Sequence, residues 1–251
     1  MAEMRDKVVW ITGGGTGIGR SAALAFAREG ARVALLGQRL DPLREVAQEV
    51  QKLGSRAQAH SLDVANRAQV REVAQRLLEE WQRVDVLVNN AGMNVGKRRL
   101  KELAGEDWDR VVAVNLTGAF NMVQAVLPPM RAQRDGLIIN VSSIAGKTAS
   151  ALAGTVYSAS KHGMVGLSHA INLEEGGYNI RATSFCPGEV NTPILDKRPI
   201  QVPREDRERM MHPDDLAQVM RMLALLPART CVTEVLLMPT YRRQMQPGEL
   251  G

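Results

Sequence analysis

Residues 7–19 read KVVWITGGGTGIG, a strand pattern that runs directly into a glycine cluster. The first half, residues 7–12, is apolar and rich in β-branched side chains, which is typical of a buried strand. The second half has glycine at positions 13, 14, 15, 17 and 19. Apolar residues then recur at helical spacing up to Gly30. The stretch therefore predicts a strand that turns through glycines into the N-terminus of a helix.

The glycine cluster has a chemical meaning as well as a conformational one. Glycines let a backbone approach a ligand closely, and a helix N-terminus presents unpaired N–H groups that attract phosphate. The spacing Gly13-x3-Gly17-x-Gly19 differs from the G-x-G-x-x-G fingerprint but serves the same geometry. A merely flexible turn is the alternative. The position between a strand and a helix favours binding of a dinucleotide pyrophosphate.

Strand-like and helix-like segments alternate along the chain. Short β-rich runs predict strands at residues 7–12, 32–36, 56–61, 84–89, 136–141, 179–185 and 234–238. Helical periodicity predicts helices at residues 17–29, 42–53, 67–81, 107–130, 157–175 and 213–226. This alternation predicts a doubly wound α/β fold, with a seven-stranded parallel sheet and helices on both faces, in one domain over residues 1–251.

One long irregular stretch interrupts the pattern, at about residues 188–212. It holds Pro193, Pro199 and Pro203 together with many charged residues. Irregular segments of this length in a compact domain are usually lids or binding loops. We therefore expect this segment to cover a binding site.

Composition excludes several classes of protein. The 251 residues are 45% hydrophobic with a net charge of +5. No run approaches about 18 apolar residues and no apolar signal region opens the chain, so we expect neither a membrane span nor secretion. The basic residues are dispersed, which disfavours nucleic-acid binding. Cys186 and Cys231 lack a C-x-x-C neighbour, so we expect no metal site, no disulfide and a reduced, cytoplasmic protein.

A second motif lies at Tyr157 and Lys161, four residues apart in a predicted helix. Residues at this spacing share one helix face, so the Lys161 ammonium can lie close to the Tyr157 phenol. A free phenol has a pKa of about 10, and a nearby cation lowers it. Beside a dinucleotide, such a pair indicates hydride chemistry on a carbonyl or alcohol. The alternative is a half-buried ring beneath a solvated ammonium.

With these motifs in order, the chain resembles the short-chain dehydrogenase/reductase family over nearly its full length. The matching segments are Thr12–Gly19, Asp63-Val64, Asn89–Gly92, Asn115, Ser142-Ser143, Tyr157-x3-Lys161, and Pro187-Gly188 with Thr192. The resemblance implies a Rossmann-type fold and an NAD(P)-dependent oxidoreductase.

The resemblance also implies a catalytic set of Asn115, Ser143, Tyr157 and Lys161. Tyr157 is then the general acid in reduction and the base in oxidation. Ser143 hydrogen-bonds the substrate oxygen, where charge develops. Lys161 lowers the pKa of Tyr157 and holds the nicotinamide ribose, and Asn115 supports a water in a proton relay. Asn115 alone is equally consistent with an amide that satisfies local backbone groups, and Ser142 is the nearest rival for the serine role.

Cofactor contacts follow from the same resemblance. They are Gly13, Gly15, Thr16, Gly17, Ile18, Gly19, Arg39, Asp63, Val64, Asn90, Ala91, Gly92, Tyr157, Lys161, Pro187, Gly188, Val190 and Thr192. The second predicted strand ends at Gly37-Gln38-Arg39, without the acid that would bind a ribose 2′-OH. Arg39 is available for a 2′-phosphate, which favours NADP over NAD. Family members that prefer NADP often carry basic residues where this chain has Thr16 and Gln38, and Arg39 is alternatively an ordinary exposed arginine.

No recognisable motif encodes the substrate. The leading interpretation is an NADP-preferring carbonyl reductase/alcohol dehydrogenase that acts on a small molecule as a homodimer or homotetramer. The run at residues 234–240 also resembles members that act on small 3-hydroxy acids, in which case Arg198 or Arg204 would bind a carboxylate. A non-catalytic dinucleotide-binding regulator is the alternative from another class. The presence of all four catalytic residues disfavours it.

Overall fold

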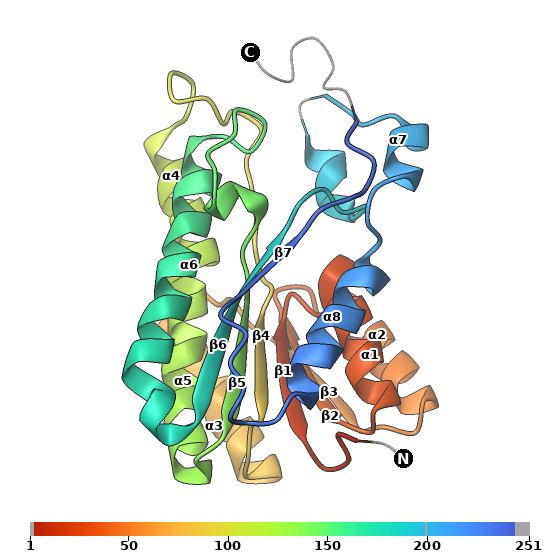
Figure 1. Cartoon of the computed structure of the whole chain (residues 1–251), viewed down its shortest axis with the longest axis vertical. Helices are drawn as coiled ribbons and strands as arrows, with labels where there is room; N and C mark the ends of the chain where they lie inside the picture. The colour runs from red at the N-terminus through yellow and green to blue at the C-terminus, as the bar shows by residue number, and fades with distance from the viewer. Residues whose placement is uncertain (1–2, 199, 244–251) are drawn as a thin grey trace.

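The computed structural model describes residues 3–198 and 200–243, and within them the strands form one parallel seven-stranded sheet (Figure 1). The strand order is β3-β2-β1-β4-β5-β6-β7, so the winding direction reverses between β1 and β4. The strands are β1 (Val8–Thr12), β2 (Arg32–Gly37), β3 (Ala57–Ser61), β4 (Val86–Asn89), β5 (Gly136–Val141), β6 (Ile180–Pro187) and β7 (Glu234–Leu237). The predicted doubly wound fold is confirmed, and each predicted strand end lies within two residues of the observed one.

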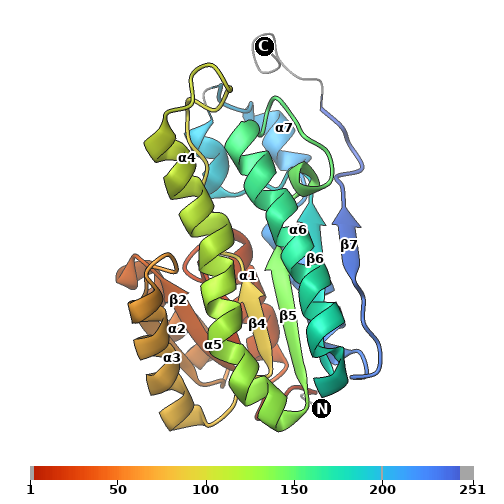
Figure 2. The same ribbon diagram turned by 90° about the vertical axis from the view of Figure 1, so that its left-hand side faces the viewer.

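Helices cover both faces of the sheet, as Figures 1 and 2 show. The helices are α1 (Gly17–Arg28), α2 (Leu40–Lys52), α3 (Arg67–Trp81), α4 (Gly105–Val112), α5 (Gly118–Gln133), α6 (Thr155–Glu175), α7 (Arg204–Glu208) and α8 (Pro213–Leu225). Helices α1, α2 and α8 pack on one face and share one hydrophobic cluster with the sheet. Helices α3, α5 and α6 pack on the other face over a second cluster. Because both faces are covered, the central strands are buried along their whole length.

A buried polar chain fixes α6 on the sheet. The Asn89 amide in β4 donates to the Asn140 side chain in β5 (2.9 Å), and Asn140 donates to the Ser168 hydroxyl in α6 (2.9 Å). All three side chains are buried, where an unpaired polar group would be costly. The chain therefore sets the position of α6, and with it that of the residues on its first turn.

The helix predicted at residues 107–130 differs from the observed one in both length and form. A continuous helical run extends from Gly105 to Gln133, and residues Ala113–Thr117 within it form a π-helical turn between α4 and α5. Such turns insert one extra residue and often accompany functional sites. Asn115 lies in this turn and is fully buried.

This helical run also bears on the membrane prediction. Residues 105–133 are long and apolar enough, by length and composition, to cross a membrane. The sequence-based prediction concerned unbroken apolar runs, which this helix does not contain; the helix meets the criterion through its mean hydropathy. Helix α5 packs its apolar face in the core, and a core helix meets the same criterion.

The segment at residues 188–212 is more ordered than the sequence predicted. It contains a 3₁₀ turn at Pro193–Lys197 and helix α7, and Val190 pairs with Met211 in an isolated parallel bridge. The reason is a small hydrophobic cluster of its own, formed by Leu195, Val202 and Met210. Pro199 lies outside the described residues. Figure 1 places this segment beyond the carboxyl ends of the strands.

Asp85, just before β4, generates a prediction about stability. Its carboxylate accepts bonds from the Val8 N–H (2.8 Å), Lys7 Nζ (2.9 Å) and Arg83 Nε (2.8 Å), which joins β1 to β4. Burial raises the pKa of Asp85, but the bonds from Arg83, Val8 and Lys7 outweigh it and hold the pKa below its usual value. We expect Asp85→Asn to lower the free energy of unfolding by about 1–3 kcal/mol in urea denaturation at pH 7.

The pH dependence of this loss gives the control. Because the folded pKa lies below the unfolded one, the stabilisation is present above pH of about 4 and disappears as pH falls through the folded pKa. The wild type and Asp85→Asn should therefore converge in acid. Asp41→Asn, whose side chain is 90% exposed, should change stability little at any pH. A constant gap between the wild type and Asp85→Asn down to pH 2 would contradict this assignment.

Candidate active site

A cavity of about 1010 Å³ opens at the carboxyl ends of the strands, where open α/β sheets place their ligands. It spans the glycine turn, the ends of β2, β4, β5 and β6, the start of α6 and the segment after Pro187. Most of the site residues predicted from sequence line it: Gly13, Thr16, Gly17, Ile18, Arg39, Asp63, Val64, Asn90, Ala91, Gly92, Ser143, Tyr157, Lys161, Pro187, Gly188, Val190 and Thr192. Gly15, Gly19 and Asn115 lie behind its wall.

The glycine turn owes its shape to residues on both sides of that wall. Gly13 and Gly17 have φ values of +63° and +53°, a region that favours glycine. A Cβ on Gly19 would lie 2.3 Å from the Gly13 carbonyl oxygen, and one on Gly15 would lie 3.0 Å from Cβ of Pro42. Gly15 and Gly19 therefore let the turn close against its neighbours, while Gly13 and Gly17 face the cavity.

Asn90 fixes this turn to the end of β4. Its side-chain amide donates to the carbonyl oxygens of Thr12 (3.0 Å) and Gly13 (3.1 Å). The Thr12 hydroxyl in turn accepts bonds from the backbone N–H groups of Asn90 (3.0 Å) and Ala91 (2.9 Å). These bonds hold the ends of β1 and β4 together at the point where the winding reverses. The bonds thereby fix the distance between the backbone at Gly13 and the backbone at Gly92, both of which line the cavity.

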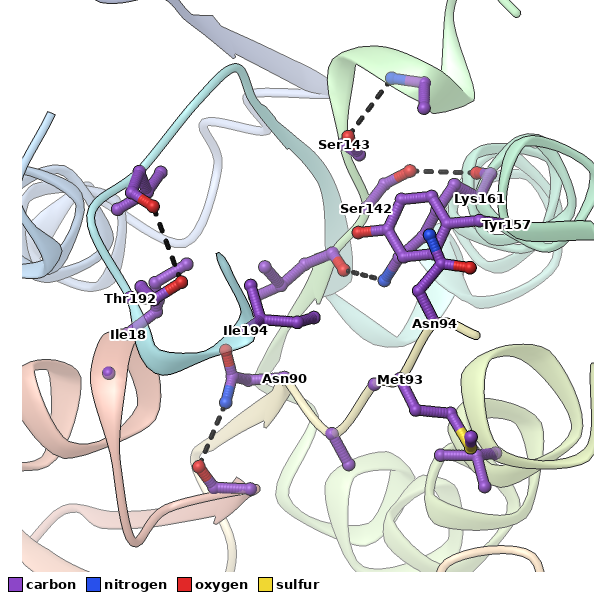
Figure 3. Close-up of a pocket in the computed structure, with 18 of the residues that line it drawn as sticks. Ile18, Asn90, Met93, Asn94, Ser142, Ser143, Tyr157, Lys161, Thr192 and Ile194 are labelled. Atoms are coloured by element: carbon purple, nitrogen blue, oxygen red, sulfur yellow. Dashed lines mark hydrogen bonds between the residues drawn. The ribbon is translucent and has the colours of Figure 1, made fainter. Parts of the chain in front are cut away.

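Tyr157 and Lys161 lie on one face of α6, as their spacing predicts, and the Tyr157 side chain points into the cavity (Figure 3). Lys161 Nζ lies 5.5 Å from the centre of the Tyr157 ring. Nζ donates to the Val141 carbonyl oxygen at the end of β5 (2.7 Å) and contacts Met164 Sδ (3.4 Å). Only 3% of Lys161 is exposed, and burial lowers its pKa to about 8. Its ammonium is therefore held by neutral acceptors alone.

The pKa of Tyr157 differs from the sequence-based expectation. Burial raises it above the ordinary value for a phenol, and the Ser143 hydroxyl and the charges of Arg198 and Arg98 partly offset this. Lys161 is not among the groups that lower it, because Lys161, with a pKa of about 8, loses its charge at a lower pH than the one at which the Tyr157 phenol ionises. The local cations that favour the phenolate are thus two arginines from other segments.

The two adjacent serines after β5 have different partners. Ser142 is buried, and its hydroxyl donates to the Lys161 carbonyl oxygen (2.8 Å), which ties β5 to α6. The Ser143 hydroxyl accepts a bond from the Ala145 N–H (3.1 Å) at the start of a 3₁₀ turn, Ile144–Gly146. Because the Ser143 oxygen is the acceptor in this bond, the Ser143 O–H group can still donate to a ligand in the cavity, which Ser143 lines beside Tyr157. This geometry favours Ser143 over Ser142 as the serine that meets a ligand.

Asn115 contacts the cavity wall from behind. Its side chain accepts a bond from the Met93 N–H (2.8 Å) and donates to the Met93 carbonyl (3.0 Å) and the Ser160 hydroxyl (3.1 Å). The backbone-satisfying role considered from sequence is thus present. A Cβ built on Gly92 would lie 3.5 Å from Asn115 Oδ1 and 3.6 Å from Lys161 Nζ. Asn115 and Lys161 therefore flank the same point beside Gly92.

Three charged residues at the Tyr157 end of the cavity were not assigned as site residues from sequence. Arg98, Glu189 and Arg198 all line it. Arg198 was considered only as one of two arginines for a carboxylate. The other, Arg204, is outside the cavity, with its side chain 93% exposed and paired with Glu208. Arg98 belonged to a short basic run that resembled a solvated patch, so only its neighbours in the fold reveal its position.

Lys161 generates a prediction that needs no substrate. Its folded pKa of about 8 lies below the unfolded value of about 10.4, so the unfolded state binds more protons between these values. The wild type should therefore gain stability relative to Lys161→Met as pH rises above about 8, with a slope approaching 1.4 kcal/mol per pH unit. Urea denaturation at pH 7, 8 and 9 measures this.

A surface lysine supplies the matched control. Lys52, at the end of α2, is exposed, and Lys52→Met should leave a gap to the wild type that does not vary with pH. The same flat result for Lys161→Met would mean that Lys161 is not the buried, weakly solvated ammonium described above.

Comparison with known proteins identifies the family to which these features belong. Residues 7–202 match the family model described as short chain dehydrogenase. The 3-oxoacyl-[acyl-carrier-protein] reductase FabG of Thermotoga maritima is 38% identical over 228 residues, which cover 88% of this chain and 91% of that protein. The D-beta-hydroxybutyrate dehydrogenase of Rhizobium meliloti is 34% identical over 205 residues, covering 81% and 78% respectively.

A solved structure gives the same result. An alcohol dehydrogenase from the archaeon Thermococcus sibiricus, complexed with 5-hydroxy-NADP, superposes with a TM-score of 0.84 at 30% identity. The match covers 96% of this chain and 99% of that one. The matched family model, the curated relatives and the shared architecture agree, and the chain belongs to the short chain dehydrogenase family.

Proposed function

We propose that this protein is an NADP-preferring carbonyl reductase/alcohol dehydrogenase that transfers a hydride between a nicotinamide and a carbonyl or secondary alcohol. The observation that carries the proposal is the meeting of Tyr157, Ser143 and Lys161 at one end of a cavity whose other end is a glycine turn. Membership of an oxidoreductase family supports it. The small-molecule substrate would enter between the loops that line the Tyr157 end.

The described residues fit a dinucleotide. Gly13 and Gly17 leave a cradle without side chains at the N-terminus of α1, which suits a pyrophosphate. Asp63 and Val64 line the cavity near the end of β2 and would contact the adenine, and Thr192 and Val190 would lie along the nicotinamide half. The remaining predicted contact residues also line the cavity between these two ends: Asn90, Ala91, Gly92, Pro187 and Gly188.

Arg39 supports a preference for NADP. It lines the cavity just after β2, it is exposed, and no described residue forms an ion pair with it. Residues 37–39, at the end of β2, include no carboxylate that would repel a 2′-phosphate. The related archaeal alcohol dehydrogenase was solved with an NADP derivative, which is consistent with this assignment.

Each of the four catalytic residues has a separate role in the proposed reduction of a carbonyl. When bound, a reduced nicotinamide supplies a hydride to the carbonyl carbon. The Tyr157 hydroxyl donates its proton to the carbonyl oxygen, and Ser143 donates a hydrogen bond to the same oxygen as negative charge develops. Lys161 would bind the nicotinamide ribose, and the charges of Arg198 and Arg98 favour the phenolate left on Tyr157. Asn115, beside Lys161 at Gly92, would hold a water that returns a proton from solvent.

Other features extend the proposal to the whole chain. Residues 188–212 would act as a lid, because they form one wall of the cavity and contain a separate small core.

Helices α5 and α6 form an outer layer (Figure 2), on which Leu173 is 87% and Phe120 37% exposed. These side chains favour a homodimer or homotetramer built on this layer. A cytoplasmic location stays a prediction from the cysteine content.

One alternative narrows the substrate class of this proposal, and a second replaces its activity. The relatives named for 3-oxoacyl and D-beta-hydroxybutyrate substrates favour a dehydrogenase of 3-hydroxy acids within the same family. A non-catalytic regulator would bind NADPH tightly but would reduce no carbonyl compound. The position of Tyr157, facing the cavity with Ser143 beside it, disfavours a regulator.

Tyr157→Phe tests the assignment of the acid. The substitution removes only the hydroxyl, so we expect reduction to fall by at least 100-fold, roughly the contribution of general acid catalysis. NADPH affinity, measured by calorimetry, should stay near that of the wild type. NADPH oxidation over ketones, aldehydes and oxo acids measures the rate. Tyr178→Phe, at an exposed tyrosine at the far end of α6, is the matched control and should retain full activity. Retention of most activity by Tyr157→Phe would assign the proton to another group.

Arg39→Ala tests the cofactor preference. Loss of a charge-assisted bond to the 2′-phosphate should weaken NADPH binding roughly 10- to 100-fold and leave NADH binding unchanged. Calorimetry with both nucleotides measures the two dissociation constants. Arg44→Ala, one turn further along α2 and also exposed, should change neither. An equal loss for NADPH and NADH would show that Arg39 does not read the 2′-phosphate.

A further inference from the structure

We propose that Arg98 and Arg198 form an anion-binding subsite beside Tyr157, and that the substrate is a carbonyl compound that carries a carboxylate. This inference rests on the proposed function, because it names the substrate class of the same site. Both arginines line the cavity that contains Tyr157. They come from separate walls: Arg98 from the loop between β4 and α4, and Arg198 from the segment after the Pro193–Lys197 turn (Figure 1).

Hydrogen bonds to the backbone fix the position of the Arg98 side chain. Its Nε donates to the Val95 carbonyl (3.1 Å) and its Nη1 to the Leu152 carbonyl (2.9 Å). Gly154, with φ of +83°, lets the chain pass so close that a Cβ there would lie 2.5 Å from Cβ of Arg98. The Arg98 carbonyl also accepts the Thr155 N–H (3.1 Å) at the start of α6. Arg98 is thus fixed relative to Tyr157, half a turn along the same helix.

The charge of Arg98 has no acidic partner. Arg98 is only 9% exposed, and among residues 3–198 and 200–243 its bonds go to backbone carbonyls alone. Burial and the nearby charge of Arg198 both lower the pKa of Arg98. A buried cation without a counter-ion is costly, and positions of this kind in a cavity are candidates for function. A bound carboxylate would supply the missing negative charge.

Arg198 adds a second positive group from the lid. Its Nη1 donates to Glu189 Oε1 (2.8 Å), which leaves the other guanidinium N–H groups without a bond to any described residue. Glu189 also accepts bonds from Arg243 Nε (3.1 and 3.2 Å), so one carboxylate is shared between two arginines. Glu189 therefore positions Arg198 without neutralising this end of the cavity.

The geometry indicates a carboxylate on a short apolar chain. Arginine presents paired N–H groups that match the two oxygens of a carboxylate. The cavity lining from the same segments includes the apolar side chains of Leu152, Ala153, Ile194 and Leu195, together with the polar side chains of Asn94 and Ser150. The subsite lies at the Tyr157 end of the cavity, whereas Arg39 serves the opposite end. A purely structural role for Arg98, in joining two loops, predicts instead that acidic and neutral substrates respond equally when it is replaced.

The test compares oxo acids with their own methyl esters. NADPH-dependent reduction of pyruvate, acetoacetate and levulinate is measured against the three methyl esters, in which a neutral group replaces the carboxylate. In Arg198→Met, and in Arg98→Met if it folds, the ratio of kcat/KM for the preferred acid to that for its ester should fall roughly 10- to 100-fold, because any change in the pKa of Tyr157 affects both substrates alike. Arg198→Lys, which keeps the charge, should restore part of the loss. Arg204→Met, at the exposed arginine of the same segment, should match the wild type.

A binding measurement separates this proposal from the proposed function. Calorimetry on Tyr157→Phe with NADP bound follows association of the same three carboxylates without turnover. We expect binding that is weakened in the double variant Tyr157→Phe/Arg198→Met. Carboxylate binding without turnover in the wild type would contradict the proposed function but support the subsite. Absence of carboxylate binding, or equal losses for acids and esters, would overturn the subsite, while reduction of neutral ketones would still support the proposed function.

Discussion

The hydrogen bond from Lys161 to the Val141 carbonyl (2.7 Å) is the contact on which the catalytic end of the cavity depends. It anchors the first turns of α6 to the end of β5, and the bond from Ser142 to the Lys161 carbonyl anchors the same place a second time. Ser143 follows β5 and Tyr157 lies on α6, so these two bonds bring their hydroxyls to one wall. An ammonium buried among neutral acceptors is costly to fold around, and proteins commonly accept such costs at functional sites.

The other half of the cavity depends on the reversal of strand order. Asn90 and Thr12 exchange bonds between β4 and β1, where helices leave the sheet toward opposite faces and no side chain fills the opening. In the proposed function the glycine turn would bind the pyrophosphate at one end of this opening, and the β5–α6 junction would supply the acid at the other. The segment that contains the Pro193–Lys197 turn contributes a third part, since Arg198 lies near Tyr157 and comes from a segment with its own small hydrophobic cluster. The glycine turn, the β5–α6 junction and this segment therefore meet at one edge of the sheet, around a single cavity.

The sequence predicted the elements well, because periodicity and glycine turns are local properties. It also predicted most of the cavity lining, since motifs at strand ends meet once the sheet is parallel. It did not predict the π-helical turn that contains Asn115, whose side chain bonds to the backbone of Met93 in a loop 22 residues earlier. Nor did it predict that Arg98 and Arg198, rather than Lys161, lower the pKa of Tyr157. Burial, counter-ions and distances between remote segments decide such electrostatic effects, and none of these is visible in residue spacing.

The measurement that tests the account most directly follows a labelled hydride. The protein is incubated with NADPH deuterated at the transferable position and with a panel of neutral ketones and oxo acids, and the products are analysed by mass spectrometry. The account predicts an alcohol that carries deuterium on the former carbonyl carbon, with one NADP formed for each alcohol. Tight binding of NADPH without a deuterated alcohol from any member of the panel would contradict it.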